Sequence, residues 1–455
     1  MTTPVETSTA EVAASGASVT ERDLAALSAP HLSPILGRYF SRSWDRGEGH
    51  ELIDTDGRRY LDFASGIATT SLGHHHPAVT AAIHEQVDKL LHICNALGYL
   101  EPVGRLAEMI ADAMPDPLDT VFFANSGSEA IEAALKLARR VTGRPGLIAF
   151  SGGFHGRTFG SVSVTTSNIN YRTGYEPLLP SVYIAPFPNV YRDFGGDETA
   201  AVQGALAGLR RIFAEEIPPS KVAGILIEAV QGEGGYYPAP PAFLQELRAL
   251  CDQHGILYIA DEVQCGFART GRMWGFEHAG VVPDVVCLAK AIANGLPLSA
   301  IVTRRELQDR WGVGAHGSTF GGNPVSCAAG VAVLRTIQEQ NLVANAEATG
   351  RQLFTGLKAI MAEEPRIGDV RGPGLMIGVE FVKDRATREP DGATADAVIA
   401  RSIDDGLILL SAGVQHQVVR WMPPIDVTPT EINRALEIFW RAVQAVPAHS
   451  EAGGP

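Results

Sequence analysis

Short apolar runs alternate along the chain with longer stretches in which apolar and polar residues repeat at helical spacing. The alternation begins after Pro77. Helical spacing is found over 78–89 and 129–140, and the apolar runs, which are rich in β-branched residues, lie at 147–150, 222–227, 256–260 and 285–288. Strands that alternate with helices in this way predict an α/β fold whose central sheet is mostly parallel and flanked by helices.

The two ends of the chain have a different pattern. Residues 51–63 contain an Asp-Gly turn between β-prone runs, which predicts a small β-ribbon. A helix is predicted from Pro324 to about residue 340, and another over 431–443. Residues 1–29 have little apolar periodicity, so we expect a flexible N-terminal segment. The predicted domains are a large α/β domain over 77–324 and a smaller α+β domain that combines 30–76 with 325–455.

Composition narrows the class of protein. The chain has 455 residues, of which 45% are hydrophobic, and a formal net charge of -14. An acidic surface repels phosphate backbones, so we do not expect a nucleic-acid partner. No apolar stretch reaches the roughly 20 residues that cross a bilayer, and the first 20 residues contain no Lys or Arg, so neither a membrane protein nor a targeting peptide is predicted. We expect a cytoplasmic protein. The five cysteines are scattered and never form a Cys-x-x-Cys pair, which argues against a disulfide framework or a zinc site.

One helix start has the features of an anion-binding site. Ser126 and Glu129 have the spacing of a capping box, in front of the helix predicted over 129–140. Gly127 and Ser128 leave backbone N–H groups and a hydroxyl at the helix N-terminus, where a phosphate can bind. A plain helix cap without a ligand explains this motif alone equally well.

Three polar side chains follow apolar strands. Lys290 comes directly after the run 285–289 and is the lysine of this chain with the most apolar surroundings. Burial of an amine lowers its pKa, and a neutral amine is needed for Schiff-base chemistry. Asp261 and Glu228 likewise follow strands, and open α/β sheets bind ligands at the carboxyl ends of their strands. An acid, an amine and a phosphate cradle together are suited to a phosphorylated aldehyde cofactor.

Two other motifs do not fit a site. The segment 312–317 matches Gly-x-Gly-x-x-Gly, but polar residues precede it and Pro324 interrupts any helix that would follow it closely, so a dinucleotide site is not expected. The three histidines at 74–76 are consecutive, so their side chains point in different directions. No second cluster has ligand spacing, and we predict no metal site.

The order of motifs resembles the class III aminotransferases, which belong to the fold type I superfamily of pyridoxal-phosphate (PLP) enzymes. The resemblance covers the chain from Tyr39 to the last predicted helix. It rests on Tyr60 to Phe63, Gly66 to Ala68, Gly73 to Pro77, Asn125 to Ala130, Phe154 to Thr158, Glu228 to Gly235, Ala260 to Gly266, Ala289 with Lys290, Thr319 to Pro324, and Arg420. It implies a PLP-dependent aminotransferase that acts as a homodimer or a higher oligomer.

The resemblance also implies roles at matched positions. Lys290 would bind the cofactor covalently and move the substrate proton, and Asp261 would pair with the pyridine nitrogen. Thr319 would contact the phosphate held by the neighbouring subunit. The expected cofactor-binding residues are Gly127, Ser128, Phe154, His155, Asp261, Val263, Gln264, Lys290, Ser318 and Thr319.

The substrate residues implied by the resemblance are Ile67, Arg157, Glu228 and Arg420. The two arginines would bind substrate carboxylates, and Glu228 would mask Arg420 when a substrate without an α-carboxylate is bound. The chain looks most like the 4-aminobutyrate aminotransferases, which implies transfer of a terminal amine to 2-oxoglutarate by a ping-pong mechanism. The alternatives are an acetylornithine or ornithine aminotransferase, an amino-acid racemase or a decarboxylase on the same scaffold, and a PLP-binding sensor without turnover.

Overall fold

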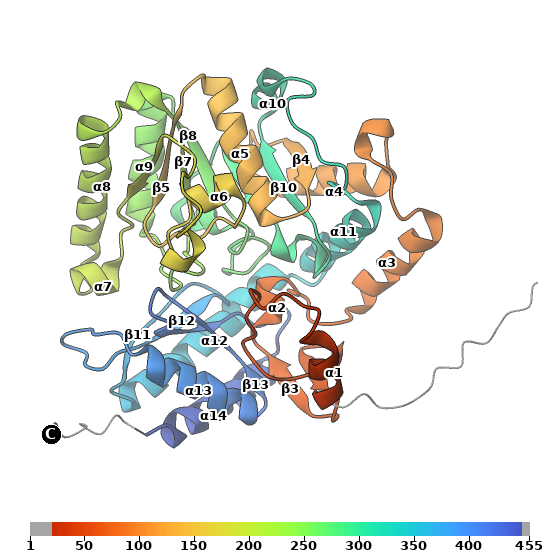
Figure 1. The fold of residues 1–455 in the computed structure, drawn as a ribbon, viewed down its shortest axis with the longest axis vertical. Coiled ribbons are helices and arrows are strands. Elements are labelled where there is room, and N and C mark those ends of the chain that lie inside the picture. Colours follow the sequence, from red (N-terminus) through yellow and green to blue (C-terminus); the bar gives the residue numbers. More distant parts are fainter. Residues whose placement is uncertain (1–20, 448–455) are drawn as a thin grey trace, which may run out of the picture.

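The computed structural model describes residues 21–447, and a seven-stranded sheet lies in its upper, larger part (Figure 1). The strand order is β4-β10-β9-β8-β7-β5-β6. β10 is antiparallel to both of its neighbours, whereas the pairs from β9 to β6 are parallel, so the predicted mostly parallel sheet is confirmed. The strands are β4 (Thr120–Ala124), β5 (Gly146–Phe150), β6 (Val182–Ala185), β7 (Val222–Ile227), β8 (Leu257–Asp261), β9 (Val285–Leu288) and β10 (Ser299–Thr303).

Helices cover both faces of this sheet. In β8, Leu257 and Ile259 pack into the cluster that contains the buried side of α5, whereas Tyr258 and Ala260 face the cluster that contains α8 and α9. This alternation is the period of two expected for a strand that is buried on both faces. The helices of this part are α3 (Pro77–Lys89), α4 (Glu101–Asp112), α5 (Gly127–Thr142), α6 (Phe159–Ser163), α7 (Val190–Phe194), α8 (Glu198–Glu215), α9 (Pro241–His254), α10 (Arg305–Trp311) and α11 (Pro324–Glu339).

Two smaller sheets lie beside the large one (Figure 1). The first has the order β1-β2-β3-β13 and the second, which is antiparallel throughout, β11-β12-β15-β14. Their strands are β1 (Trp44–Glu48), β2 (Glu51–Asp54), β3 (Arg59–Asp62), β11 (Ile367–Arg371), β12 (Ile377–Phe381), β13 (Leu407–Ile408), β14 (Leu410–Ala412) and β15 (Val418–Trp421). The helices here are α12 (Leu342–Glu363), α13 (Gly392–Asp404) and α14 (Pro429–Ala445).

The pairing of β13 with β3 joins the two ends of the chain. It is parallel and places Leu407 beside Leu61. The predicted ribbon is present as β2 and β3, and the predicted last helix is α14, which begins with a capping box between Thr428 and Glu431. The exact domain boundaries stay a prediction.

The N-terminal segment differs in part from the expectation. Residues 21–28 form helix α1 (Glu21–Ser28). The run from Leu24 to Leu27 consists of Leu and Ala, which are strong helix formers even without an apolar stripe. Residues 1–20 of the segment predicted to be flexible lie outside the described residues. Within residues 21–447, none of the helices is long and apolar enough to cross a membrane.

Candidate active site

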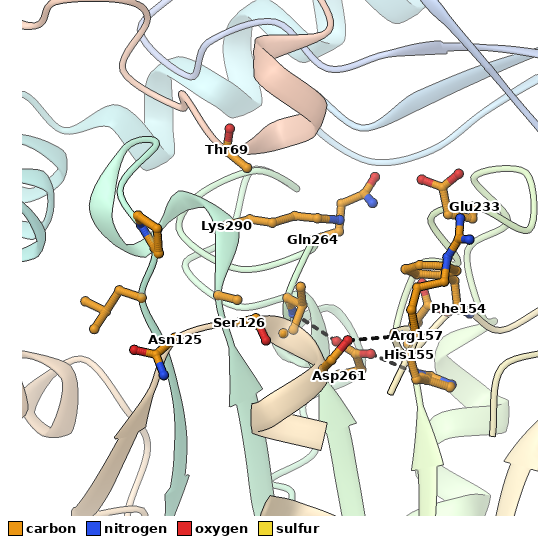
Figure 2. A pocket seen from close by; sticks show the side chains of 18 of the residues that line it. Thr69, Asn125, Ser126, Phe154, His155, Arg157, Glu233, Asp261, Gln264 and Lys290 are labelled. Atoms are coloured by element: carbon orange, nitrogen blue, oxygen red, sulfur yellow. Dashed lines mark hydrogen bonds and ion pairs between the residues drawn. The ribbon is translucent and has the colours of Figure 1, made fainter. Parts of the chain in front are cut away.

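Three strand ends of the large sheet meet at one cavity of about 310 Å³ (Figure 2). Asp261 is the last residue of β8, Glu228 follows β7, and Lys290 lies two residues beyond β9. All three line the cavity, as the sequence predicts. Its other lining residues include Ser126, Gly127, Ser128, Phe154, His155, Arg157, Val263 and Gln264.

Asp261 is held in place by two contacts. Its Oδ2 lies 2.7 Å from Nδ1 of His155, and its Oδ1 accepts a hydrogen bond of 3.0 Å from the backbone N–H of Val263. Burial alone lowers the pKa of His155, but the hydrogen bond and the charge of Asp261 outweigh it and raise that pKa. A buried histidine–carboxylate pair, which favours the charged form of the ring, therefore stands at the end of β8.

Lys290 is the first residue of a short 3₁₀ helix, η5 (Lys290–Ala293), and has a positive φ of 49°. Positive φ is uncommon for a residue with a side chain and tends to occur at functional sites. Burial lowers the pKa of the Lys290 amine, while the charge of Glu233 opposes this shift. A larger neutral fraction makes the amine a better nucleophile.

The N-terminus of α5, where the sequence predicts an anion cradle, lies at the cavity. Oγ of Ser126 accepts a hydrogen bond of 3.3 Å from the backbone N–H of Glu129, so Ser126 is the N-cap. The reciprocal half of the predicted capping box is wrong: the Glu129 carboxylate binds the backbone and side-chain N–H groups of Asn125 at 2.8 Å. Oγ of Ser128 accepts a hydrogen bond from the backbone N–H of Arg157.

Gln264 has a fixed amide orientation. Its Oε1 accepts a hydrogen bond of 2.7 Å from the hydroxyl of Tyr236, which leaves its Nε2 available as a donor. Tyr236 itself was not predicted as part of the site. It follows the Gly-Gly pair of the motif 228–235, and its aromatic side chain is fully buried.

Arg157 lies at the rim of the cavity. Its guanidinium stacks 3.7 Å from the ring centroid of Tyr171 and lies 5.7 Å from that of Phe154. Stacking fixes the plane of a guanidinium and leaves its N–H groups free for a carboxylate. Tyr171 was not predicted and is the residue that orients this arginine.

Arg420 is buried on β15, and its ionic partner differs from the prediction. Its Nη1 pairs with the carboxylate of Glu233, not with Glu228. The Glu228 carboxylate is instead taken by the backbone N–H groups of Phe154 and Gly232, at 2.9 and 2.7 Å. The assignment of Glu228 as the residue that masks Arg420 is therefore wrong, and Glu233 occupies that place. The charges of Arg420 and Lys290 lower the pKa of Glu233 although its burial raises it.

Four predicted site residues do not line the cavity: Arg420, which reaches it only through Glu233, and Ile67, Ser318 and Thr319, which lie beside it. Oγ of Ser318 accepts a hydrogen bond of 3.0 Å from Asn125, and Thr319 is exposed. Ile67 belongs to a turn, α2 (Ser65–Ala68), in which all four residues have positive φ, and it packs against a buried apolar cluster. The turn places Thr69 at the cavity instead (Figure 2).

The family model for class-III aminotransferases matches residues 37–443. The chain belongs to this family. It is 42% identical to the 4-aminobutyrate aminotransferase of Escherichia coli (strain K12) over 396 residues, which are 87% of the chain and 92% of that protein. The acetylornithine aminotransferase of Methanopyrus kandleri is 40% identical over 90% of the chain and 98% of its own length.

Solved structures of aminotransferases have the same fold as this enzyme. The taurine:2-oxoglutarate aminotransferase of Bifidobacterium kashiwanohense, solved with PLP and glutamate, superposes with a TM-score of 0.88. It is 28% identical, and the match covers 93% of this chain and 98% of that one. The predicted fold type I architecture is confirmed.

PLP is the cofactor of class III aminotransferases, and the cavity of this aminotransferase fits it. A side chain at position 127 would approach Val263 Cγ1 to 3.1 Å, so the glycine keeps the space at the N-terminus of α5 open for a phosphate. A carboxylate and an amine lie at the neighbouring strand ends. When bound, PLP withdraws electrons from the substrate carbon that carries the amino group.

Proposed function

We propose that this aminotransferase moves the terminal amino group of an ω-amino acid similar to 4-aminobutyrate to 2-oxoglutarate, by a ping-pong mechanism. The products are a semialdehyde and glutamate. The observation that carries the proposal is the buried pair of Arg420 and Glu233 beside a second arginine, Arg157, at the cavity rim. Because Glu233 can neutralise Arg420 when no substrate carboxylate does, the cavity is suited both to 4-aminobutyrate, which has one carboxylate, and to 2-oxoglutarate, which has two.

Each residue around the cavity has a separate role in this proposal. With PLP bound, Lys290 would hold it covalently and would carry a proton between substrate and cofactor. Asp261, held by His155, would keep the ring nitrogen protonated. The N-terminus of α5, with Gly127 and Ser128, would hold the phosphate. Phe154 and Val263 would pack against the ring, and Gln264 would donate a hydrogen bond to the phenolic oxygen.

The two arginines distinguish the substrates. Arg157 binds the carboxylate that both substrates carry at the end far from the reacting carbon. Arg420 binds the α-carboxylate of 2-oxoglutarate after Glu233 moves aside, and it stays paired with Glu233 when 4-aminobutyrate is bound. Bidentate pairing with a guanidinium suits both carboxylates.

The similarity to an acetylornithine aminotransferase supports a second candidate donor, N-acetylornithine. This donor carries an α-carboxylate at the far end from its reacting δ-amine and an acetylated α-nitrogen. Its chain from carboxylate to reacting amine is one carbon longer than that of 4-aminobutyrate and equal to that of 5-aminovalerate. 5-Aminovalerate is the donor named for a relative from Pseudomonas aeruginosa that is 40% identical.

Single-turnover spectroscopy of the separate half-reactions tests the proposal. We expect 4-aminobutyrate or 5-aminovalerate to convert the cofactor faster than N-acetylornithine, with release of a semialdehyde. In the Arg420→Ala variant the half-reaction with 2-oxoglutarate falls far more than that with 4-aminobutyrate. Loss of a buried, charge-assisted pair costs roughly 2 to 5 kcal/mol, because the substrate carboxylate is left unpaired.

The Arg157→Ala variant is the comparison, and it should weaken both half-reactions. If Arg420→Ala weakens both half-reactions equally or neither of them, the proposed dual use of this site is wrong. If instead a single enantiomer of a chiral amino acid is converted to a mixture of both enantiomers, without release of aldehyde, the racemase alternative is favoured.

We propose further that the enzyme is a homodimer and that Thr319 contacts the partner's cofactor phosphate. Apolar side chains gather around Thr319, where Nδ2 of Asn95 donates a hydrogen bond of 2.8 Å to the carbonyl of Gly321. An exposed apolar cluster of this kind marks a protein interface. Its most exposed members are Leu91 (62%), Leu97 (76%), Tyr99 (107%) and Phe320 (60%).

Light scattering, which measures the molar mass of the enzyme in solution, tests the proposed dimer. We expect a mass of twice 48.4 kDa for the natural enzyme. The Phe320→Glu variant should shift toward the monomer, because a charge would be buried without a partner. Val282→Glu, at an apolar residue that is 36% exposed and distant in sequence from this cluster, is the control and should leave the mass unchanged. A natural enzyme that stays monomeric at micromolar concentration would contradict the proposal.

A further inference from the structure

Two arginines of the small antiparallel sheet lie at one cross-strand position. Arg371 on β11 pairs with Gly378 on β12, and Gly378 pairs in turn with Arg420 on β15. Directly paired residues of neighbouring strands have their side chains on the same face of the sheet. The arginine that binds Glu233 therefore has a second arginine two strands away on the same face.

The segment 230–238, here called the gate loop, lies on this face. A side chain at position 378 would approach Cβ of Tyr236 to 3.0 Å and the carbonyl oxygen of Gly235 to 3.3 Å. The absence of a side chain at Gly378 thus lets the backbone of the gate loop pack directly on β12. An isolated bridge between Val230 and Pro238 closes the loop at its base.

Both arginines bind the gate loop, but through different groups. Arg420 pairs with the side chain of Glu233. Arg371 donates two hydrogen bonds to the carbonyl oxygen of Gly235, from Nε at 3.1 Å and from Nη2 at 2.5 Å. The first contact involves a side chain that a substrate can displace, whereas the second involves the backbone.

We propose that Arg371 is a positioning residue for substrate choice: it holds the backbone of the gate loop in register, so that the Glu233 side chain alone moves when Arg420 changes partners. This inference rests on the proposed use of Arg420 for an α-carboxylate. It assigns to Arg371 no contact with substrate or cofactor.

The surroundings of Arg371 suit a fixed anchor. Its Nη1 lies 2.7 Å from Oε2 of Glu380, a fully buried carboxylate that also accepts a hydrogen bond of 2.7 Å from Tyr237. The guanidinium stacks 3.7 Å from the ring centroid of Tyr237, and Arg192 of α7 pairs with the same Glu380. A planar guanidinium that is stacked and bound on several edges has little freedom to move.

The other contacts of the gate loop agree with the proposal that the Glu233 side chain moves while the rest of the loop stays in place. The backbone N–H of Gly413 donates a hydrogen bond of 2.9 Å to the carbonyl of Glu233. Nε2 of Gln231 donates one of 2.7 Å to the carbonyl of Ser151. Elements outside the loop therefore hold it at the carbonyl of Glu233 and through the side chain of Gln231.

Loss of the Arg371 contacts should change the relative rates of the two half-reactions in one direction. A gate loop that lifts from β12 moves the Glu233 carboxylate away from Arg420 and leaves a buried positive charge without its partner. Substrates that bring an α-carboxylate then bind at lower cost, and substrates that lack one bind next to an uncompensated cation. The rate ratio of the 2-oxoglutarate to the 4-aminobutyrate half-reaction should increase.

The Arg371→Lys variant tests this. Lysine keeps a positive charge for Glu380 and so favours folding, but it cannot donate two parallel hydrogen bonds to one carbonyl. We expect the ratio of the two half-reactions, each as the single-turnover rate constant divided by the dissociation constant, to increase by about tenfold. Calorimetric binding of glutarate, an unreactive dicarboxylate, should become tighter in parallel. Asp369→Asn is the matched control, because it removes another partner of Arg371, at 3.2 Å, without touching the loop.

A double-mutant cycle with Glu233→Gln separates this inference from the proposed function. If Arg371 acts through Glu233, Arg371→Lys leaves the ratio unchanged in the Glu233→Gln background. If Glu233→Gln itself leaves the ratio unchanged, the proposed use of Arg420 is wrong. Two outcomes would contradict the role of Arg371 while Glu233→Gln raises the ratio. In the first, Arg371→Lys does not raise the ratio. In the second, Arg371→Lys raises it equally in the natural and the Glu233→Gln backgrounds.

A second variant, Gly378→Ala, tests the same inference if Arg371→Lys does not fold. Gly378→Ala adds a methyl group under the gate loop and leaves both arginines in place. It should raise the same ratio, because the added Cβ would lie 3.0 Å from Cβ of Tyr236 and 3.3 Å from the carbonyl oxygen of Gly235, so the gate loop has to shift by a few tenths of an ångström. An unchanged ratio in a folded Gly378→Ala enzyme overturns the inference.

Discussion

The Lys290→Ala variant is expected to lose transamination by at least about ten thousandfold, the scale seen when a covalent catalytic group is removed. No other amine reaches the cavity among the residues that line it. The variant should still bind PLP noncovalently, because the N-terminus of α5 and Asp261 are unchanged. Absorbance spectra should show the loss of the band of the covalently bound cofactor.

Borohydride reduction followed by peptide mapping supplies the decisive control. In the natural enzyme the cofactor should be fixed at Lys290. Lys221→Ala, at an exposed lysine just before β7, should retain both the covalent cofactor and the activity. Covalent fixation at a different lysine in the Lys290→Ala variant would show that the nucleophile has been wrongly assigned.

The positions of Lys290 and Asp261 could be predicted because each depends on local sequence and on one general rule. The apolar runs before them are long enough to identify β8 and β9, which the structure places within one residue of the prediction. The carboxyl ends of parallel strands meet at one edge of a sheet. Two residues that are 29 positions apart therefore lie at one cavity, and no tertiary detail is needed to infer it.

The choice between Glu228 and Glu233 could not be made in this way. Both acids lie in one glycine-rich segment, whose path is set by contacts with distant residues. Arg371 and Gly413 hold the segment from positions more than 130 residues later in the chain. Gly235 also has a φ of 129°, which a sequence pattern does not reveal. The electrostatic partner of Arg420 is thus a product of the tertiary fold.

Thr69 was missed for a related reason. Its place at the cavity depends on a turn in which Ser65, Gly66, Ile67 and Ala68 all have positive φ. Of these, only glycine commonly adopts such values, so the local sequence favours an ordinary helical turn. The hydrogen bond from Oγ of Ser65 to the carbonyl of Met422 helps to hold the turn, and this contact joins residues 357 positions apart.

The Asp261→Asn variant is expected to reduce turnover by about a thousandfold or more, because it removes a buried charge that acts only while negative charge develops on the substrate carbon. The substitution keeps the shape of the side chain. A neutral amide cannot hold a proton on the ring nitrogen, so the cofactor loses its strength as an electron acceptor. Preorganised charges in such a site are worth at least about a hundredfold each. Steady-state kinetics of both half-reactions should show equal losses, since both share this step.

His155 gives this variant a readout besides activity. The carboxylate of Asp261 raises the pKa of His155 against the effect of burial, so its loss should lower that pKa and leave the imidazole neutral. Nitrogen chemical shifts of the His155 ring measure this directly. Glu262→Gln is the matched control one residue further along, because Glu262 does not line the cavity and its carboxyl oxygens accept hydrogen bonds from the backbone N–H groups of Gly275 and Phe276. This substitution should lower stability through the lost acceptor, while turnover per folded enzyme should change little. Near-normal turnover in Asp261→Asn, together with a neutral His155, would show that the reaction does not need the negative charge of Asp261. Asp261 would then be excluded as the partner of the ring nitrogen.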